Sequence, residues 1–279
     1  MSSPFSDNPQ FACLLAGRED QVDLVRLMLE FATDEYPALD VQGPLTELAR
    51  LGQAAQEAVA ESGREATERL QAVSELLYGQ EGFRGNHDAY YDPRNSYLNE
   101  VLERRLGIPI SLAIVYTAVG RQAGLDLFGV GSPGHFMVGC HDGGRTLYVD
   151  PFDAGTVLDE QACRERIERV LGQQNVLSSE HLRAATPREI AARVLRNLKA
   201  AYAMRDSWPE ALPIQLRLVA LLPELPDERR DLGLIYLRNS DPHPAAKLLE
   251  EYIDKAPPAD AEAVLPFLKS ARRMVAERN

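Results

Sequence analysis

Three residues between positions 111 and 150 have the types that nucleophilic catalysis requires. Ser111 lies near the start of the apolar run "PISLAIVYTAVG", His135 follows "SPG", and Asp150 follows "LYV". A serine hydroxyl becomes a useful nucleophile only when a histidine accepts its proton and an acidic group orients that histidine. The residue types therefore raise the hypothesis of a Ser111–His135–Asp150 triad, provided that the surrounding elements bring the three side chains together.

The apolar run around Ser111 reads as a buried helix. Pro109 suits a first helical turn, Gly124 suits a helix end, and apolar residues occupy nearly every face between them. Ser111 would then lie in the first turn, where free backbone N–H groups and the positive end of the helix dipole stabilise developing negative charge.

Two short strand patterns carry the other candidates. "HFMVGCH" and "RTLYVDPF" are separated by the turn sequence "DGG" at 142–144, which predicts an antiparallel hairpin. His135 would begin the first strand and Asp150 would end the second, so the two side chains could meet on one face. The same residues also have simple structural interpretations, because a serine near a helix start is commonly a cap and a histidine after "PG" is commonly a turn residue.

Upstream of this stretch the pattern is helical and then irregular. Positions 21–83 show three- and four-residue apolar spacing, whereas Gly82 to Arg94 forms an ordered loop in our interpretation. A further helix should begin at an N-cap at Asn95 or Ser96 and end at Gly107. Four residues of this region are candidates for lining a cleft: Tyr90, Tyr91, Asn95 and Asn99. For the two tyrosines, core packing is the favoured alternative.

The last hundred residues contain a repeat. Leu198 and Leu232, and likewise Tyr202 and Tyr236, are 34 residues apart, which is the period of tetratricopeptide helix pairs. We expect these four residues to be buried between helices. Polar residues on the concave side would contact a ligand, for example Arg196, Arg230 and Asn239.

Composition excludes several classes of function. A net charge of −12 and a pI near 5.0 argue against nucleic acid or anionic membrane as a partner. The N-terminus lacks a basic region followed by an apolar one, and no run of 18 apolar residues occurs, so we expect a cytoplasmic protein without a membrane span. The scattered Cys13, Cys140 and Cys163 suggest neither a disulfide framework nor a zinc site, and we expect no metal and no cofactor.

Several runs resemble one known family. "YYDPRNSYLNEVLERRLGIPISLAIVYTAVGRQAGL", "GHFMV" and "LYVDPF" resemble the bacterial SirB-type transglutaminase-like proteins. The resemblance implies an α+β, papain-like core with N-terminal helices, followed by an all-α tetratricopeptide segment. It implies a transglutaminase-like domain over 1–185 and a helical domain over 186–279. Enzymes of this type place a nucleophilic cysteine at a helix N-terminus, then a histidine and an aspartate on successive strands.

This sequence departs from that pattern at the nucleophile, because Ser111 occupies the helix position. A thiol beside an imidazolium can exist as a thiolate at neutral pH, whereas a serine hydroxyl must lose its proton during attack. Cys140 lies five residues after His135, which places it on the opposite face of a regular strand. We therefore expect a pseudoenzyme that binds or regulates a protein or peptide. The alternative is a serine-dependent hydrolase or acyltransferase that acts on an amide or ester.

Overall fold

The computed structural model describes residue 5 and residues 7–174 and 178–278. The chain divides into two compact units, 1–194 and 195–279. This division falls inside α8 (Pro187–Ala203), whereas the boundary expected from the sequence, between 185 and 186, precedes that helix.

Seven α-helices and six strands precede α8 in the described part of the first unit. The helices are α1 (Pro9–Leu15), α2 (Leu24–Ala32), α3 (Gln42–Glu61), α4 (Ala66–Ser74), α5 (Leu98–Arg104), α6 (Pro109–Gln122) and α7 (Glu160–Leu171). The strands are β1 (Arg84–Gly85), β2 (Leu106–Gly107), β3 (Leu127–Val130), β4 (Met137–Asp142), β5 (Arg145–Asp150) and β6 (Thr156–Leu158). A π-helical stretch, Glu75–Gln80, continues α4.

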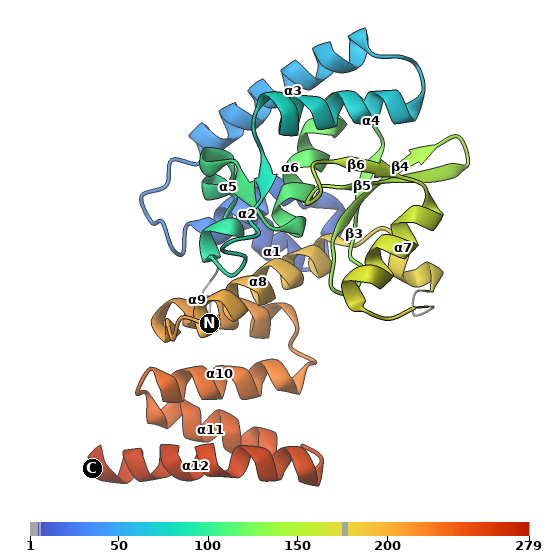
Figure 1. Cartoon of the computed structure of the whole chain (residues 1–279). Coiled ribbons are helices and arrows are strands. Elements are labelled where there is room, and N and C mark those ends of the chain that lie inside the picture. The colour runs from blue at the N-terminus through green and yellow to red at the C-terminus, as the bar shows by residue number, and fades with distance from the viewer. Residues whose placement is uncertain (1–4, 6, 175–177, 279) are drawn as a thin grey trace. The chain divides into compact units, whose positions relative to one another are not determined.

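Helix α6 forms the centre of the first unit. Eleven of its fourteen residues are buried, which explains why the helix is apolar on nearly every face. Figure 1 shows α3 and α4 across one side of α6 and the strands of the four-stranded sheet on another. Pro109 occupies the first turn as the sequence predicts, and Gly124, at φ +78°, follows the helix end.

The four-stranded sheet is an antiparallel meander in the order β3-β4-β5-β6. Asp142 pairs with Arg145, so the β4–β5 turn consists of Gly143 and Gly144, both with positive φ. This is the backbone that a two-residue hairpin loop needs, and glycine adopts it without steric cost. The predicted hairpin between 142 and 145 is present.

The region before α6 differs from the sequence-based expectation. Asn95 ends a 3-10 turn, Pro93–Asn95, and α5 begins at Leu98 with Tyr97 as its N-cap. Arg105, in the left-handed conformation at φ 57°, ends α5 before Gly107. Residues 84–85 and 106–107 then pair as short parallel strands. Segments of two residues are too short to show a strand periodicity, so the sequence does not predict this pairing.

The second unit consists of the last part of α8 and of α9 (Trp208–Leu221), α10 (Pro226–Arg238), α11 (Pro242–Ile253) and α12 (Pro258–Arg278). Helix α10 packs against α9 and α11, and α11 packs against α12; Figure 1 shows α10, α11 and α12 stacked in order. Leu198, Tyr202 and Leu232 are buried as expected. Tyr236 is only partly buried, so that expectation was wrong; the neighbouring Ile235 is the buried residue.

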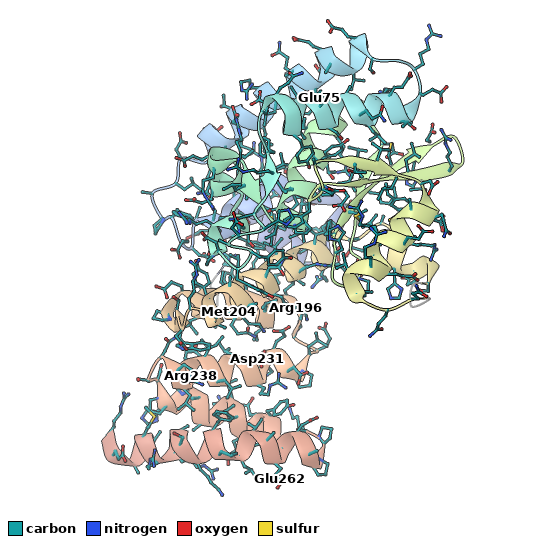
Figure 2. The ribbon with its side chains drawn as sticks, in the orientation of Figure 1. Glu75, Arg196, Met204, Asp231, Arg238 and Glu262 are labelled. Carbon is teal, nitrogen blue, oxygen red and sulfur yellow. The ribbon has the colours of Figure 1, made fainter. Side chains whose placement is uncertain are left out.

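A buried carboxylate joins α8 and α10 within this unit. Glu228, 5% exposed, accepts hydrogen bonds from Arg196, Lys199 and Gln215. Lys199 also pairs with Asp231 at 2.9 Å. Figure 2 shows Arg196 extending from α8 and Asp231 from α10. The charged residues at these positions therefore cross-link the repeats.

The polar residues expected to contact a ligand have partners inside the second unit. Arg230 pairs with Asp227 and Asp231, and the Asn239 amide donates to the carbonyl oxygen of Trp208. Arg196 pairs with Glu228 while 48% of its side chain stays exposed. Among the described residues, none of the helices combines the length and apolar character that a membrane crossing requires.

Candidate functional site

Ser111 occupies the third position of α6 and is 2% exposed. Its Oγ accepts a hydrogen bond from the Ile108 N–H at 3.1 Å, which satisfies one of the free N–H groups at the helix start. The hydroxyl donates to the carbonyl oxygen of Asn95 at 2.6 Å, and Oγ also lies 3.1 Å from the Ile108 carbonyl oxygen. The serine thus ties the first turn of α6 to the end of the preceding 3-10 turn.

His135 and Asp150 form a buried hydrogen-bonded pair. His135, 5% exposed, lies two residues before β4 and not on the strand itself, while Asp150, 1% exposed, ends β5. The antiparallel β4–β5 pairing brings the ends of the two segments together, and His135 Nε2 lies 3.0 Å from Asp150 Oδ1. An aspartate in this position fixes the tautomer and the orientation of the imidazole.

Both carboxylate oxygens of Asp150 are engaged. Oδ1 also accepts the backbone N–H of Phe152 at 3.1 Å, and Oδ2 accepts Arg166 Nη1 at 2.8 Å. Burial raises the pKa of the Asp150 carboxyl, but the hydrogen bond and charge of His135, the Phe152 N–H and the Arg166 charge outweigh it. The net result is a pKa below the usual value for aspartate, so the group is a carboxylate at neutral pH.

The structure joins His135 to Asp150 but does not join Ser111 to His135. Within the described chain, the hydrogen bonds of the Ser111 hydroxyl go to Asn95 and Ile108 and none goes to the imidazole. The proton that a general base would have to remove is donated to a backbone carbonyl. This arrangement resembles a helix-start hydrogen bond more closely than a primed nucleophile.

Asn95 anchors the loop that precedes Ser111. Its side chain has no exposed surface, accepts a hydrogen bond from Asn86 Nδ2 at 2.9 Å, and donates to the carbonyl oxygens of Ala89 at 2.7 Å and Tyr90 at 3.1 Å. Asn95 therefore holds the loop from inside and cannot line an open cleft with its side chain.

The other cleft candidates occupy three different environments. Tyr91 is 50% exposed, and the ring of Tyr90, 37% exposed, lies 6.0 Å from the ring of Phe152, two residues after Asp150. Asn99 faces a separate open hollow with Leu39, Pro44 and Arg105, and its Oδ1 is buried. Tyr90 thus contacts the segment that directly follows Asp150.

The cysteines supply no activated thiol. Cys140 lies on β4 and is 2% exposed, and burial, with the nearby Asp126 and Asp142 charges, raises the pKa of its thiol. Cys163, on α7, is fully buried, and burial followed by the Asp150 charge raises its pKa to about 12. Both thiols are therefore protonated at neutral pH. No group of three or more His, Cys, Asp and Glu side chains suited to a metal ion occurs in the described ranges.

Comparison with known protein families shows to which superfamily the first unit is related. The description "Transglutaminase-like superfamily" matches residues 44–196, which include Ser111, His135 and Asp150. The chain belongs to the transglutaminase-like superfamily. A tetratricopeptide repeat description matches residues 198–272, in agreement with the 34-residue period.

Bacterial relatives of this transglutaminase-like protein extend over most of its length. A UPF0162 protein of Xylella fastidiosa (strain Temecula1) is 38% identical over 249 residues, which cover 86% of both chains. A UPF0162 protein of Vibrio cholerae is 30% identical over 78% of this chain and 80% of its own. F-box only protein 21 of Mus musculus is 39% identical over 112 residues, 37% of this chain and 17% of that protein. No solved structure gave a significant match.

Sequence reasoning missed two residues of the transglutaminase-like core that support the site. Arg166 on α7 holds the second oxygen of Asp150 and also pairs with Asp153 at 2.7 Å. Asn86 holds Asn95 across the loop. An arginine on a helix and an asparagine in a loop have no motif of their own, and only the folded chain shows what they contact.

Proposed function

We propose that this transglutaminase-like protein acts by binding another protein or a peptide and that its core performs no covalent catalysis. The observation that carries the proposal is the 2.6 Å hydrogen bond from the Ser111 hydroxyl to the Asn95 carbonyl oxygen. A catalytic serine needs a base within hydrogen-bond reach of its proton. Here the serine proton is used to connect α6 to the loop before it.

Burial supports the same proposal. Ser111, His135 and Asp150 are 2%, 5% and 1% exposed, so an amide or ester bond would have to displace protein atoms to reach the hydroxyl. The thiolate–imidazolium pair typical of such a site cannot form with a serine, because the hydroxyl stays protonated until attack. The His135–Asp150 pair would then serve the fold, since it connects the start of β4 with the end of β5.

The helical repeats supply the surface for a partner. Stacked helix pairs present an extended concave face, and such repeats commonly bind peptides or proteins. Met204, in the turn that follows α8, has an apolar side chain and is 64% exposed (Figure 2), and methionine is enriched at protein interfaces. We place the protein in the cytoplasm, which its three free cysteines support because a reducing compartment keeps thiols free.

One observation favours catalysis as a second candidate function. The 3.0 Å contact between His135 Nε2 and Asp150 Oδ1 leaves Nδ1 of the imidazole for another partner, as a triad requires. A serine-dependent hydrolase or acyltransferase would require a rotation of the Ser111 side chain that brings its hydroxyl to that nitrogen. Such a rotation would break the hydrogen bonds to Asn95 and Ile108.

Complementation of a strain that lacks the protein distinguishes the binding function from the catalytic function, because the two predict different results for the same variants. Under the binding proposal, Ser111→Ala and His135→Gln restore the wild-type growth and proteome, whereas Met204→Glu, at an exposed site, does not. Glu262→Lys, an exposed substitution on α12, serves as the control for surface charge. Complementation by Met204→Glu together with failure of Ser111→Ala, at equal protein levels, would contradict the proposal.

A further inference from the structure

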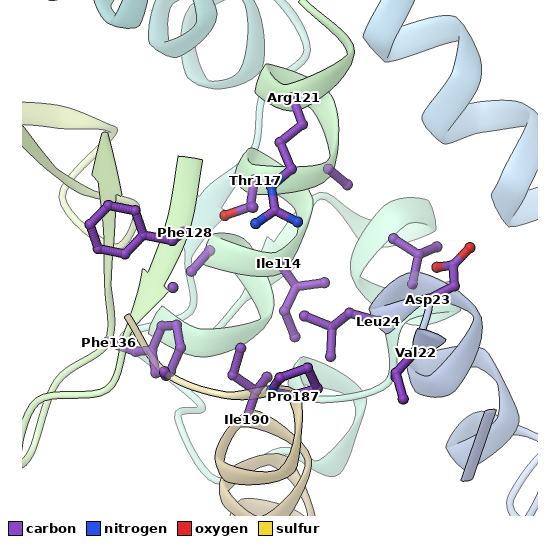
Figure 3. Close-up of a pocket in the computed structure, with 15 residues that line it drawn as sticks. Val22, Asp23, Leu24, Ile114, Thr117, Arg121, Phe128, Phe136, Pro187 and Ile190 are labelled. Atoms are coloured by element: carbon purple, nitrogen blue, oxygen red, sulfur yellow. The ribbon is translucent and has the colours of Figure 1, made fainter. Parts of the chain in front are cut away.

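A cavity of about 350 Å³ lies in the first unit, away from the Ser111 hydroxyl contacts. It is bounded by the start of α2, one side of α6, β3 and the start of α8 (Figure 3). This volume is at the lower end of the range for small-molecule pockets. The wall is mainly apolar, with contributions from Val22, Leu24, Ile114, Phe128, Phe136 and Ile190.

One cation is fixed at this cavity. Arg121 Nε donates to the carbonyl oxygen of Leu127 at 2.8 Å, which holds the plane of the guanidinium. Arg121 is an exposed residue, and Figure 3 shows its guanidinium directed from α6 toward the cavity. In the described chain no partner is recorded for its two terminal nitrogens. Those nitrogens can donate side by side to the two oxygens of a carboxylate.

A second polar group lies one helical turn before Arg121. Thr117 is 9% exposed and lines the cavity, and residues four apart share a face of a helix. Its hydroxyl has no hydrogen-bond partner among the residues that the structure describes. The hydroxyl is therefore available to donate a hydrogen bond to a ligand oxygen in the cavity.

The remaining charged residue at the cavity is already paired. Asp23 accepts the backbone N–H of Arg26 at 3.1 Å, and its second oxygen lies 3.4 Å from Arg26 Nε. Arg121 therefore supplies the uncompensated charge at this pocket. The single positive charge of Arg121 can neutralise a ligand with one negative charge. A doubly charged phosphate would leave one negative charge unpaired beside an apolar wall.

We propose that this cavity binds a small carboxylic acid with an apolar chain. The carboxylate accepts hydrogen bonds from the terminal nitrogens of Arg121 and from the Thr117 hydroxyl, and the chain packs against Ile114 and Phe136. The shape and the charge of the pocket thus select an amphipathic monoanion. The site is independent of the proposed partner binding through the repeats.

The probe is octanoate, and isothermal titration calorimetry measures its binding to the full chain. Octanamide, which has the same chain length and no charge, is the control ligand. We expect octanoate to bind one to one and octanamide at least about tenfold more weakly, because the charge-assisted hydrogen bonds are lost. Arg121→Gln and the isosteric Thr117→Val should weaken octanoate binding. Arg64→Gln, at an exposed loop residue, should leave it unchanged.

Ala118→Leu tests the cavity without altering its charge. Ala118 lines the pocket on a partly exposed helix position, so a leucine fills the space at little cost to folding, which circular dichroism checks. It should abolish octanoate binding. Equal affinity for octanoate and octanamide, or unchanged binding by Ala118→Leu, would overturn the proposal. Tighter binding of a peptide ending in leucine than of octanoate would also overturn it, because the occupant would then be a polypeptide terminus.

Discussion

Arg166 Nη1 lies 2.8 Å from Asp150 Oδ2, the carboxylate oxygen that His135 does not contact. The arginine comes from α7, which packs against β5, so the carboxylate is held between a helix and the loop before β4. A second bond from the same nitrogen reaches Asp153 at 2.7 Å. The orientation of the His135 imidazole therefore depends on this arginine as well as on the aspartate.

Replacing Arg166 with Gln should destabilise the protein by about 1–3 kcal/mol, because the buried Asp150 carboxylate loses a charged donor. The matched control is Arg164→Gln on the same helix, whose pair with Glu160 is more exposed and should contribute less than about 1 kcal/mol. Urea denaturation measures both. Equal losses for the two variants would show that Arg166 does not support Asp150.

The lowered pKa of Asp150 predicts a pH dependence of stability. Because the folded protein holds this carboxyl charged, the unfolded chain binds more protons around the usual aspartate value of 3.8. The contribution is fully present above that value and is lost as the pH falls through the lower, folded pKa. Unfolding free energies of the wild type and of Asp150→Asn, measured from about pH 5 to pH 3, should fall more steeply for the wild type. Parallel curves would contradict the assignment.

Ser111→Ala should cost only about 1 kcal/mol, because it removes one neutral hydrogen-bonding hydroxyl and leaves no large cavity. Asn95→Ala should cost about 3 kcal/mol, since it leaves Asn86 and two backbone carbonyls without partners in a buried loop. Chemical denaturation gives both values. If Ser111→Ala proved the more damaging of the two, the serine would have a role beyond this helix-start bond.

The α6 helix and the β4–β5 hairpin could be predicted from the sequence because their signals are local. Pro109 marks the helix start, and two glycines mark a tight turn between strand patterns. The position of the turn fixes the register between β4 and β5. The approach of His135 to Asp150 could therefore be predicted. The position of His135 just before the strand, and not on it, could not, because strand ends have no sharp signature.

The environment of the serine hydroxyl could not be predicted. Its acceptor is the backbone carbonyl of Asn95, and any residue type supplies such a carbonyl. The burial of Tyr236 was misjudged for a related reason. The 34-residue period identifies equivalent positions in two repeats, but Tyr202 and Tyr236 have different neighbours and therefore different exposure.

Burial predicts the order in which the cysteines react. Cys13 is partly exposed, whereas Cys140 and Cys163 are buried and have raised thiol pKa values. Iodoacetamide at about pH 8 should alkylate Cys13 first and leave the other two protected until the chain unfolds. Peptide mapping by mass spectrometry checks the order. Early alkylation of Cys163 would contradict this order and show that α7 does not shield the thiol.

The most direct test of the non-catalytic proposal is labelling with a fluorophosphonate, followed by intact-mass measurement. Such reagents form a covalent adduct with an activated serine and leave an unactivated one unchanged. Because the Ser111 hydroxyl is buried and bonded to the Asn95 carbonyl oxygen, the wild-type protein should show no stoichiometric adduct. A one-to-one adduct on Ser111 that disappears in both Ser111→Ala and His135→Gln would contradict the account.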